Sequence, residues 1–436
     1  MPAKNLQNPA SGPVIPTWLI GLQSLSCNVS QGIGSLLQGS SCRATLPGRA
    51  VREAVEELVD AEILGWSSSG EHDVLPARQV RRWPTMSGMG ITTAVSVESF
   101  REAAGPLVDV RTPREFHQGH WPGAINIPLF TDAQRHDVGL TYKQQGRHAA
   151  IQLGLTLCGP RLGDLSESLT RTAGGAAQPL RLYCWRGGMR SNSMAWLAAL
   201  QDHPTLVLEG GYKVYRRWVL EQFERRWPIR LLGGRTGTGK TDLLIALQSL
   251  NVAVVDLEGL AHHRGSSFGG LGQPNQPSTE HYENELAEAL NGYGKQHAPQ
   301  IWLEAESSSV GCCRIPKALF EQMQQAPVLE IRRSLDERID QLVDVYACQD
   351  ADELCKATER IQRRLGPQRT QAALEAIRDQ RWRDACSAML DYYDRCYDHE
   401  LKQARDTANL DLSGRNPEDA AIELLNTSRV VPIDAP

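Results

Sequence analysis

The sequence predicts an α/β fold in two successive units, followed by an all-α C-terminal region. Between residues 107 and 303, short apolar runs typical of buried strands alternate with longer stretches of helical apolar spacing. Beyond about Ser334 the apolar spacing is helical almost to the end of the chain. We therefore expect an N-terminal extension at residues 1–88, α/β units at 89–222 and 223–333, and a helical region at 334–436.

The composition is that of an ordinary globular protein. With 436 residues, the chain is long enough for about three domains. Hydrophobic residues make up 41% and charged residues 22%, which excludes wholesale disorder. The 46 basic and 51 acidic side chains give a formal net charge of −5, so any nucleic-acid contact must use a local basic surface. No apolar run is long enough to span a membrane, and we expect no membrane partner.

Ten cysteines are present, but none belongs to a C-x-x-C pair. Such spacing favours neither a disulfide framework nor a zinc module, so no metal site is expected. The apolar patch at residues 18–22 follows several prolines and a single lysine, which is unlike a secretory signal. We expect a reducing compartment and a cytoplasmic location, with most thiols acting as small hydrophobic side chains.

Residues 1–88 differ in character from the rest of the chain. The first fifty residues carry only Lys4, Arg43 and Arg49 as charges and are rich in Ser, Gly, Asn, Gln and Pro, which predicts weak order. A helix is expected within residues 51–64. One interpretation of Met86 and Met89, at the boundary, is that translation begins there. We assign no function to this extension.

Seven strands are expected in the two α/β units. Those of the first unit are residues 107–110, 124–127, 180–183 and 206–208, and those of the second are 229–232, 252–255 and 301–303. Two of these strands are followed by glycine-rich segments with reactive or phosphate-binding character, and these segments carry the functional prediction.

The first glycine-rich segment contains Cys184, between the strand at 180–183 and a helix expected at 192–200. A cysteine there faces the free amides of a helix N-terminus, and Gly187 and Gly188 let the loop curl its amides inward. Arg186 and Arg190 add positive charge, which together with the amides lowers a thiol pKa and binds anions. The alternative is a buried, inert cysteine in a tight turn.

Two chemistries fit this cysteine segment. A cysteine followed by five residues and Arg-Ser describes the loop of cysteine phosphatases, in which the thiolate attacks phosphorus. The sequence upstream of Cys184 instead closely resembles the rhodanese domain, whose cysteine carries a chalcogen. The resembling segments are residues 109–111 and 119–128. The resemblance implies a carrier thiolate at Cys184. Asp109 and Arg111, at a strand end, would form a salt bridge that supports the loop rather than take part in catalysis.

The second segment is a phosphate loop of the P-loop NTPase type. Its G-x-x-x-x-G-K-T pattern lies between a strand and an amphipathic helix, and its members are Gly234, Gly237, Gly239, Lys240 and Thr241. Loop amides would wrap a di- or triphosphate, Lys240 would neutralise it, and the Thr241 hydroxyl could hold Mg²⁺.

The sequence does not decide which carboxylate accompanies this phosphate loop. Asp256 and Glu304 each end a strand, so either could take the magnesium-side role, and either could equally be a solvated or capping residue.

Two stretches are locally basic. Residues 212–230 hold six cations against two carboxylates, interleaved with aromatic residues, and residues 356–369 hold five cations against one. The first predicts either RNA contact through stacking or an amphipathic connecting helix with buried aromatics. The second predicts either phosphate contacts or a charged helix face.

The order of these parts resembles the bacterial tRNA 2-selenouridine synthase family, in which a rhodanese-like domain precedes a P-loop domain and a helical tail. The resemblance runs from about residue 92 towards the C-terminus, and its most specific segments are residues 141–146, 184–191, 209–213, 256–268 and 303–307. Residues 1–88 depart from the family.

The resemblance implies a two-step reaction on 2-thiouridine at the tRNA wobble position, U34. The thio group is first S-alkylated by geranyl diphosphate, and selenium from selenophosphate then displaces the geranyl thiol to give 2-selenouridine. Cys184 would carry selenium as an S-selanyl group, while the loop amides, Arg186 and Arg190 bind the donor's phosphate. The phosphate loop would bind geranyl diphosphate or a nucleotide. No tightly bound cofactor is expected, apart from a possible role for Mg²⁺.

Two further functions compete with this one. An NTP-dependent rhodanese-type sulfurtransferase or kinase acting on RNA would hydrolyse nucleotide and need no isoprenoid diphosphate. A nucleotide-sensing RNA-binding switch would use Cys184 as a redox sensor.

Overall fold

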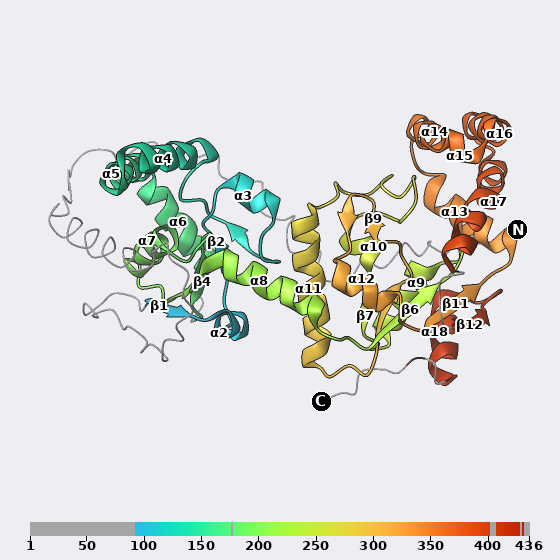
Figure 1. The fold of residues 1–436 in the computed structure, drawn as a ribbon, viewed down its shortest axis with the longest axis horizontal. Helices are drawn as coiled ribbons and strands as arrows, with labels where there is room; N and C mark the ends of the chain where they lie inside the picture. The colour runs from blue at the N-terminus through green and yellow to red at the C-terminus, as the bar shows by residue number, and fades with distance from the viewer. Residues whose placement is uncertain (1–91, 176–177, 402–406, 428–429, 431–436) are drawn as a thin grey trace, which may run out of the picture. The chain divides into compact units, whose positions relative to one another are not determined.

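The computed structural model describes residues 92–175, 178–401, 407–427 and 430. The expected extension at residues 1–88, including the helix within residues 51–64, lies outside this described part. Within it, the predicted fold class is confirmed: a first α/β unit is followed by a second one and by a helical C-terminal region (Figure 1).

The first unit is built on a five-stranded parallel sheet in the order β1-β5-β4-β2-β3. Its strands are β1 (Thr92–Val95), β2 (Leu107–Asp109), β3 (Ile125–Asn126), β4 (Leu180–Tyr183) and β5 (Thr205–Leu208). All four predicted strands are present. Sequence reasoning missed β1 because an edge strand, here only half-buried, carries no continuous apolar run.

Helices cover both faces of this first sheet. In chain order they are α2 (Val97–Glu102), α3 (Pro113–Gln118), α4 (Asp132–Gln145), α5 (Arg147–Cys158), α6 (Leu162–Ala173), α7 (Met189–Ala199) and α8 (Gly211–Glu224). One core joins α6 and α7 to one face, with Leu169 and Met194 fully buried. On the other face, α2 and α8 bury Phe100, Tyr212 and Tyr215. The sheet is therefore buried on both sides, as parallel sheets generally are.

The second unit has its own five-stranded parallel sheet, in the order β12-β11-β6-β8-β7. Its strands are β6 (Ile229–Gly233), β7 (Val254–Val255), β8 (Ile301–Glu304), β11 (Val328–Arg332) and β12 (Thr407–Asp411), and a short antiparallel pair consists of β9 (Ser309–Val310) and β10 (Cys313–Arg314). Its helices are α9 (Lys240–Ser249), α10 (Leu257–Leu260), α11 (Thr279–Lys295) and α12 (Lys317–Met323). The three strands predicted for this unit are confirmed.

The C-terminal region is helical but not all-α, which corrects the prediction. Its helices are α13 (Leu335–Tyr346), α14 (Ala351–Arg360), α15 (Gln362–Leu365), α16 (Pro367–Arg378), α17 (Trp382–Leu401) and α18 (Pro417–Asn426). Between α17 and α18 the chain returns to the second sheet as its edge strand β12, which pairs in parallel with β11. The strand was missed because Thr407–Asp411 is short and alternates polar residues with Ala408 and Leu410, so it offers no continuous apolar run.

Two interpretations were open for the basic stretch at 212–230, namely RNA contact through stacking or an amphipathic helix with buried aromatics. The structure favours the second, because the stretch begins with helix α8 and its aromatic side chains are buried or half-buried. Tyr212 and Tyr215 are fully buried, and Tyr215 stacks on Trp121 with ring centroids 3.9 Å apart. The predicted boundary between residues 222 and 223 falls inside this helix. Lys213 and Arg217 remain exposed on its outer face.

Among the helices of the described residues, none is both long and apolar enough to cross a membrane.

Helix α18 follows β12 in the chain, and its inner face packs in the core of the second sheet. A substitution on that face therefore tests whether the end of the chain packs on this sheet. Leu424 is fully buried there together with Leu244 and Trp302. We expect Leu424→Ala to lower the free energy of unfolding by about 2–5 kcal/mol, the usual cost of such a cavity. Chemical denaturation measures this loss. Ile422→Ala, on the exposed side of the same helix, is the matched control and should change stability by less than about 0.5 kcal/mol. Equal effects of the two substitutions would contradict this packing.

Candidate active site

Cys184 directly follows β4, at the carboxyl edge of the first sheet, and the loop it opens ends where α7 begins at Met189. The cysteine is 3% exposed, and its Sγ lies 3.3 Å from Ser191 Oγ. Gly188 is the N-cap of α7 and offers no side chain to bond the first amides of the helix. A helix N-terminus of this kind favours an anion beside the thiol.

The close fit of the loop explains its glycines. Gly187 has φ of +67°, and a Cβ there would lie 2.3 Å from the carbonyl oxygen of Leu208. Behind the loop, the amides of Tyr212 and Lys213 donate to the carbonyl oxygens of Cys184 and Trp185, at 2.8 and 3.1 Å. The first turn of α8 thus fixes the backbone that carries the cysteine.

Three guanidinium groups surround this loop. Arg190 forms an ion pair with Glu115 (Nη1 to Oε2, 2.7 Å), whose carboxylate also belongs to the capping box of α3. Burial acts to raise the pKa of Glu115, but the hydrogen bonds and charge of Arg190 outweigh it and lower that pKa. Arg186 is exposed. The third group is Arg135 on α4, whose pKa is lowered by partial burial and by the neighbouring charge of Arg190.

Sequence reasoning did not single out Arg135 or Glu115. Arg135 stands in an ordinary polar helix, far from the cysteine in sequence and outside any motif, so only the fold brings it near the loop. Glu115 could have been found through its capping box, because Thr112 and Glu115 have the required spacing ahead of a helix.

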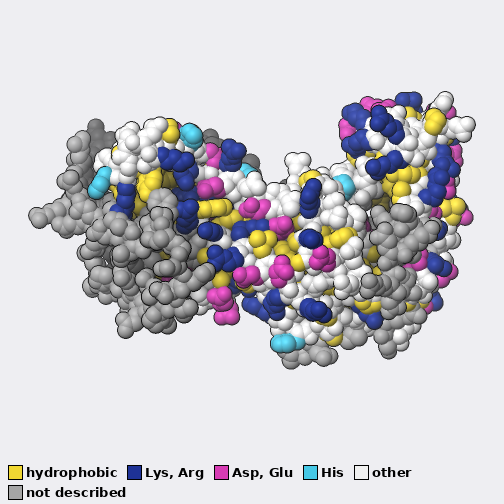
Figure 2. Space-filling model, viewed as in Figure 1, with side chains coloured by type: hydrophobic (Ala, Val, Ile, Leu, Met, Phe, Trp, Pro, Cys, Tyr) yellow, Lys and Arg dark blue, Asp and Glu magenta, His cyan; other side chains and the backbone are white. Residues whose placement is uncertain are grey.

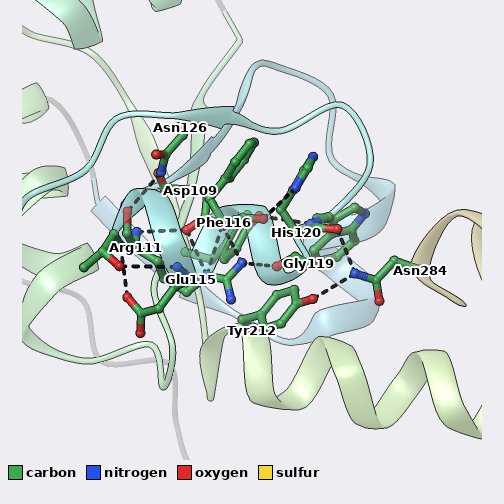
Figure 3. Close-up of polar contacts among 12 residues, drawn as sticks. Asp109, Arg111, Glu115, Phe116, Gly119, His120, Asn126, Tyr212 and Asn284 are labelled. Carbon is green, nitrogen blue, oxygen red and sulfur yellow. Dashed lines mark hydrogen bonds and ion pairs between the residues drawn. The ribbon is translucent and has the colours of Figure 1, made fainter. Parts of the chain in front are cut away.

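Asp109 and Arg111 form a fully buried ion pair at the end of β2, with Arg111 Nη2 2.7 Å from Asp109 Oδ2. The same nitrogen donates to the carbonyl oxygen of Gly119 at 2.6 Å. Burial raises the pKa of Asp109, and the bonds from Arg111 oppose that shift. The guanidinium carbon of Arg111 lies 3.7 Å from the ring centroid of Tyr212, so the ion pair supports the residue whose amide holds the Cys184 carbonyl (Figure 3).

Tyr212 also reaches towards α11. Its hydroxyl donates to Glu280 Oε1 and accepts a bond from Asn284 Nδ2, both at 2.8 Å. Asn284 donates to the carbonyl oxygen of His120 at 2.8 Å as well, as Figure 3 shows. A buried tyrosine therefore links the cysteine loop to the helix that follows the glycine-rich segment 265–272.

The phosphate loop joins β6 to α9, which begins at Lys240. Gly237 has φ of +82°, and a Cβ there would lie 2.5 Å from the carbonyl oxygen of Arg338. Lys240 Nζ donates to the carbonyl oxygen of Gly234 at 2.9 Å, which places the ammonium group inside the curve of the loop. The predicted members Gly234, Gly237, Gly239, Lys240 and Thr241 thus share one strand-to-helix turn.

Two arginines from the helical region bind the outside of the phosphate loop. Arg333 Nε donates to the carbonyl oxygen of Thr238 at 3.0 Å, and Arg338 Nε donates to that of Thr236 at 2.8 Å. Both follow the loop by about a hundred residues, and no local signal in the sequence pointed to them. They fix the backbone of the loop, while their charges are paired with Glu337 and Asp394.

The carboxylate in contact with the phosphate loop is Glu258, which sequence reasoning did not single out. Thr241 Oγ1 donates to Glu258 Oε2 at 3.2 Å. Asp256 instead caps α10, accepting from the amide of Gly259 at 2.7 Å. Glu304 is fully buried and accepts from the amide of Leu257 at 2.8 Å. The signal was present, since Glu258 lies two residues beyond the strand end at Asp256.

Burial and the nearby charges set the protonation of these carboxyl groups. Burial raises the pKa of Glu258, while Lys240 and the bond from Thr241 act in the opposite direction. Burial, reinforced by Asp256 and Glu258, raises the pKa of Glu304 well above its usual range. The described residues contain no group of three or more His, Cys, Asp or Glu side chains arranged to hold a metal ion. A Mg²⁺ ion at Thr241 and Glu258 would therefore take its other ligands from phosphate and water, which suits that ion.

Known families match both units. Residues 93–217 match the rhodanese-like domain, and residues 227–424 match the AAA domain of tRNA 2-selenouridine synthase. The tRNA 2-selenouridine synthase of Sulfurovum sp. (strain NBC37-1) is 35% identical over 333 residues, which cover 68% of this chain and 89% of that protein. That of Alcanivorax borkumensis is 37% identical over 345 residues, 69% of this chain and 91% of that protein. The chain belongs to the tRNA 2-selenouridine synthase family.

Membership accounts for the combination of parts. A cysteine cradle and a phosphate loop occur in many unrelated proteins, so neither would have identified the family alone. Both occur in one chain, each inside the domain that the family model expects, and the resemblance stated from the sequence is confirmed.

The buried ion pair can be tested through stability. Asp109→Asn keeps the shape of the side chain but leaves Arg111 with a buried, uncompensated charge, and we expect a loss of roughly 3–5 kcal/mol in the free energy of unfolding. Glu167→Gln removes an exposed ion pair with Arg171 and should cost less than about 1 kcal/mol. Denaturant titration of both variants makes the comparison. Similar small losses would show that the ion pair does not support the fold.

Proposed function

We propose that the chain converts 2-thiouridine at the tRNA wobble position to 2-selenouridine, through an S-geranyl intermediate, using geranyl diphosphate and selenophosphate. The observation that carries this proposal is the presence of two separate anion sites in one member of the tRNA 2-selenouridine synthase family. One surrounds a thiol and the other contains the lysine of a phosphate loop. A two-step reaction with two phosphorylated donors needs two such sites.

The phosphate loop is proposed to serve the first step. The thiocarbonyl sulfur of the base attacks the first carbon of the geranyl group, the carbon–oxygen bond to diphosphate breaks, and the base loses its N3 proton. Lys240 and the loop amides stabilise the negative charge of the leaving diphosphate. The product carries a neutral thioether in place of the thiocarbonyl group, and this sulfur can depart as a thiol.

The cysteine cradle is proposed to serve the second step. The Cys184 thiolate attacks selenium of selenophosphate, forming an S–Se bond. The electron pair of the P–Se bond stays on phosphorus, which is reduced from P(V) to P(III), takes up a proton and leaves as phosphite. The amides of Gly187 and Gly188, with Arg135, Arg186 and Arg190, bind the phosphate half of the donor.

Selenium then passes to the tRNA. A thiol reductant supplies two electrons and frees the selenium from Cys184 as hydroselenide. Hydroselenide adds to C2 of the base, the geranyl thiolate leaves and takes up a proton, and the proton of hydroselenide goes to N3. The product is 2-selenouridine.

An exposed basic surface is available for the tRNA backbone. Lys356, Arg360, Arg363, Arg364 and Arg369 are all exposed. Figure 2 shows Lys and Arg side chains gathered over the part of the helical region that contains α14. Such side chains bind phosphates without reading sequence, so they would place the tRNA rather than select its wobble base.

Replacing Cys184 separates the two steps. In the presence of thiolated tRNA, geranyl diphosphate and selenophosphate, Cys184→Ser should lose selenation, because serine forms no S–Se bond, while S-geranyl-2-thiouridine accumulates. Mass spectrometry of digested nucleosides measures both products. Cys312→Ser, at an exposed cysteine, is the control and should behave like the unaltered protein. Full selenation by Cys184→Ser would overturn the carrier role.

Replacing Lys240 tests the first step. Lys240→Ala should reduce geranylation at least a hundredfold, because the leaving diphosphate loses its nearest cation. The same nucleoside assay, without selenophosphate, reports the rate, and Lys295→Ala on the exposed end of α11 is the control. If the protein hydrolysed a nucleoside triphosphate in response to tRNA and needed no isoprenoid diphosphate, an NTP-dependent sulfurtransferase or kinase would replace this proposal.

A further inference from the structure

Trp185, the residue directly after Cys184, carries an exposed aromatic ring. Trp185 is 38% exposed, whereas Cys184 is 3% exposed. Every other tryptophan among the described residues is buried or half-buried. The hydrophobic effect favours burial of so large a ring. Its exposure beside a reactive thiol therefore indicates a surface that a ligand covers.

The indole is held in place from the protein side. The carbonyl oxygen of Trp185 accepts a bond from the amide of Lys213 at 3.1 Å. Its ring centroid lies 5.8 Å from that of Tyr212, with the two planes inclined at 40°. The guanidinium carbon of Arg111 lies 5.9 Å from the same indole centroid. A ring fixed in this way has little conformational freedom left to lose when a ligand covers it.

Exposed cations accompany this ring. Lys213 and Arg217 are four residues apart on α8, so they share one face of the helix, and both are exposed. The aromatic side chains of α8 itself are buried or half-buried, which leaves Trp185 as the exposed ring beside these cations. Proteins that bind single-stranded nucleic acid combine the same two features, because bases stack on aromatic rings and phosphates pair with Lys and Arg.

We propose that the wobble base of the tRNA stacks on Trp185 while Lys213 and Arg217 bind the neighbouring phosphates. The inference rests on the proposed function and adds the place where the base is bound for selenium transfer. Consecutive Cα atoms are about 3.8 Å apart, so a base on Trp185 lies beside the residue that carries selenium. Hydroselenide freed from Cys184 is then released next to C2 of the base rather than into bulk water.

A nucleobase suits this surface better than the geranyl group does. A hydrocarbon chain gains affinity when apolar side chains surround it. The exposed residues next to Trp185 are the charged Arg186 and Lys213, which do not provide such surroundings. A base needs only one covered face, and its polar edges stay in contact with water and cations.

Substitution of the ring tests the stacking contact. The assay supplies tRNA carrying S-geranyl-2-thiouridine, selenophosphate and a thiol reductant, and nucleoside mass spectrometry gives kcat and KM for the tRNA. Stacking on an aromatic side chain contributes roughly 5- to 150-fold in affinity, so Trp185→Ala should lower kcat/KM by a factor in that range, mainly through KM. Trp185→Phe keeps an aromatic face and should stay within about threefold of the unaltered protein. Unchanged kcat/KM in Trp185→Ala would overturn the inference.

Two controls accompany this assay. Leu155→Ala removes an exposed apolar side chain of α5 and should leave kcat/KM unchanged. Selenium loading of Cys184, measured without tRNA as the mass of the Cys184 peptide, should be the same in Trp185→Ala and in the unaltered protein, because the donor does not contact the indole. Should Trp185→Ala not fold, photo-crosslinking of the unaltered protein to tRNA carrying 4-thiouridine at the wobble position decides. Crosslinks should fall on the peptide that contains Trp185, and crosslinks to other segments alone would overturn the inference.

Binding measurements distinguish the base from the geranyl group and test the phosphate contacts. Trp185→Ala should weaken tRNA with 2-thiouridine and tRNA with S-geranyl-2-thiouridine by the same factor. A loss confined to the geranylated tRNA would overturn base stacking in favour of the hydrocarbon chain. Lys213→Ala should reduce the slope of log affinity against log salt by about 0.7, the value for one phosphate of a single strand. An unchanged slope would overturn the phosphate contact of Lys213.

The outcomes for the inference and for the proposed function are separate. Failure of the unaltered protein to load selenium on Cys184 would overturn the proposed function, whatever Trp185 does. Normal loading together with full transfer by Trp185→Ala would overturn the stacking contact alone.

Discussion

The buried ion pair between Asp109 and Arg111 is the interaction on which the cysteine site depends. Both side chains are fully buried, and the desolvation of two such charges is costly unless their hydrogen-bonding groups are satisfied. Here Arg111 bonds Asp109 and the Gly119 carbonyl, while Asn126 Nδ2 donates to the carbonyl oxygens of both Asp109 and Arg111 at 2.9 Å. The guanidinium face, which forms no hydrogen bonds, lies on Tyr212. An ion pair whose hydrogen-bonding groups are satisfied in this way holds one geometry. Tyr212 packs on it and donates from its amide to the carbonyl oxygen of Cys184, so the ion pair helps to fix the backbone of the cysteine.

The two anion sites use one construction. In each, a parallel strand ends, a glycine loop turns, and a helix begins at a glycine N-cap, which has no side chain to bond the first amides. The glycines are required by close approach, since a Cβ at Gly187 or Gly237 would overlap a carbonyl oxygen. The sites differ in the group aimed at the anion: a thiol in one and an ammonium in the other. In the proposed function, that difference separates a covalent carrier from a site that binds its anion by charge.

Local sequence was sufficient for the seven predicted strands and for both loops, because periodicity, glycine spacing and the G-x-x-x-x-G-K-T pattern are all short-range signals. It was insufficient for the groups that complete each site. Arg135 and Arg338 approach their loops only after helices far apart in sequence have packed. Glu258 lies only two residues beyond Asp256, inside a short helix, so spacing alone does not distinguish the two carboxylates. The edge strand β12 was missed for a related reason, because its place is set by pairing with β11 rather than by its own residues.

The return of the chain to β12 explains how the helical region is held against the phosphate loop. Helices α13 to α17 form an excursion from the second sheet, which the chain leaves after β11 and rejoins beside it. An excursion held at both ends by one sheet has little freedom to move away from the loop on that sheet. Arg333 and Arg338, at the start of the excursion, bond the loop carbonyls directly, and Asp394 near its end pairs with Arg338. The helical region is thereby a wall of the phosphate site rather than a separate appendage.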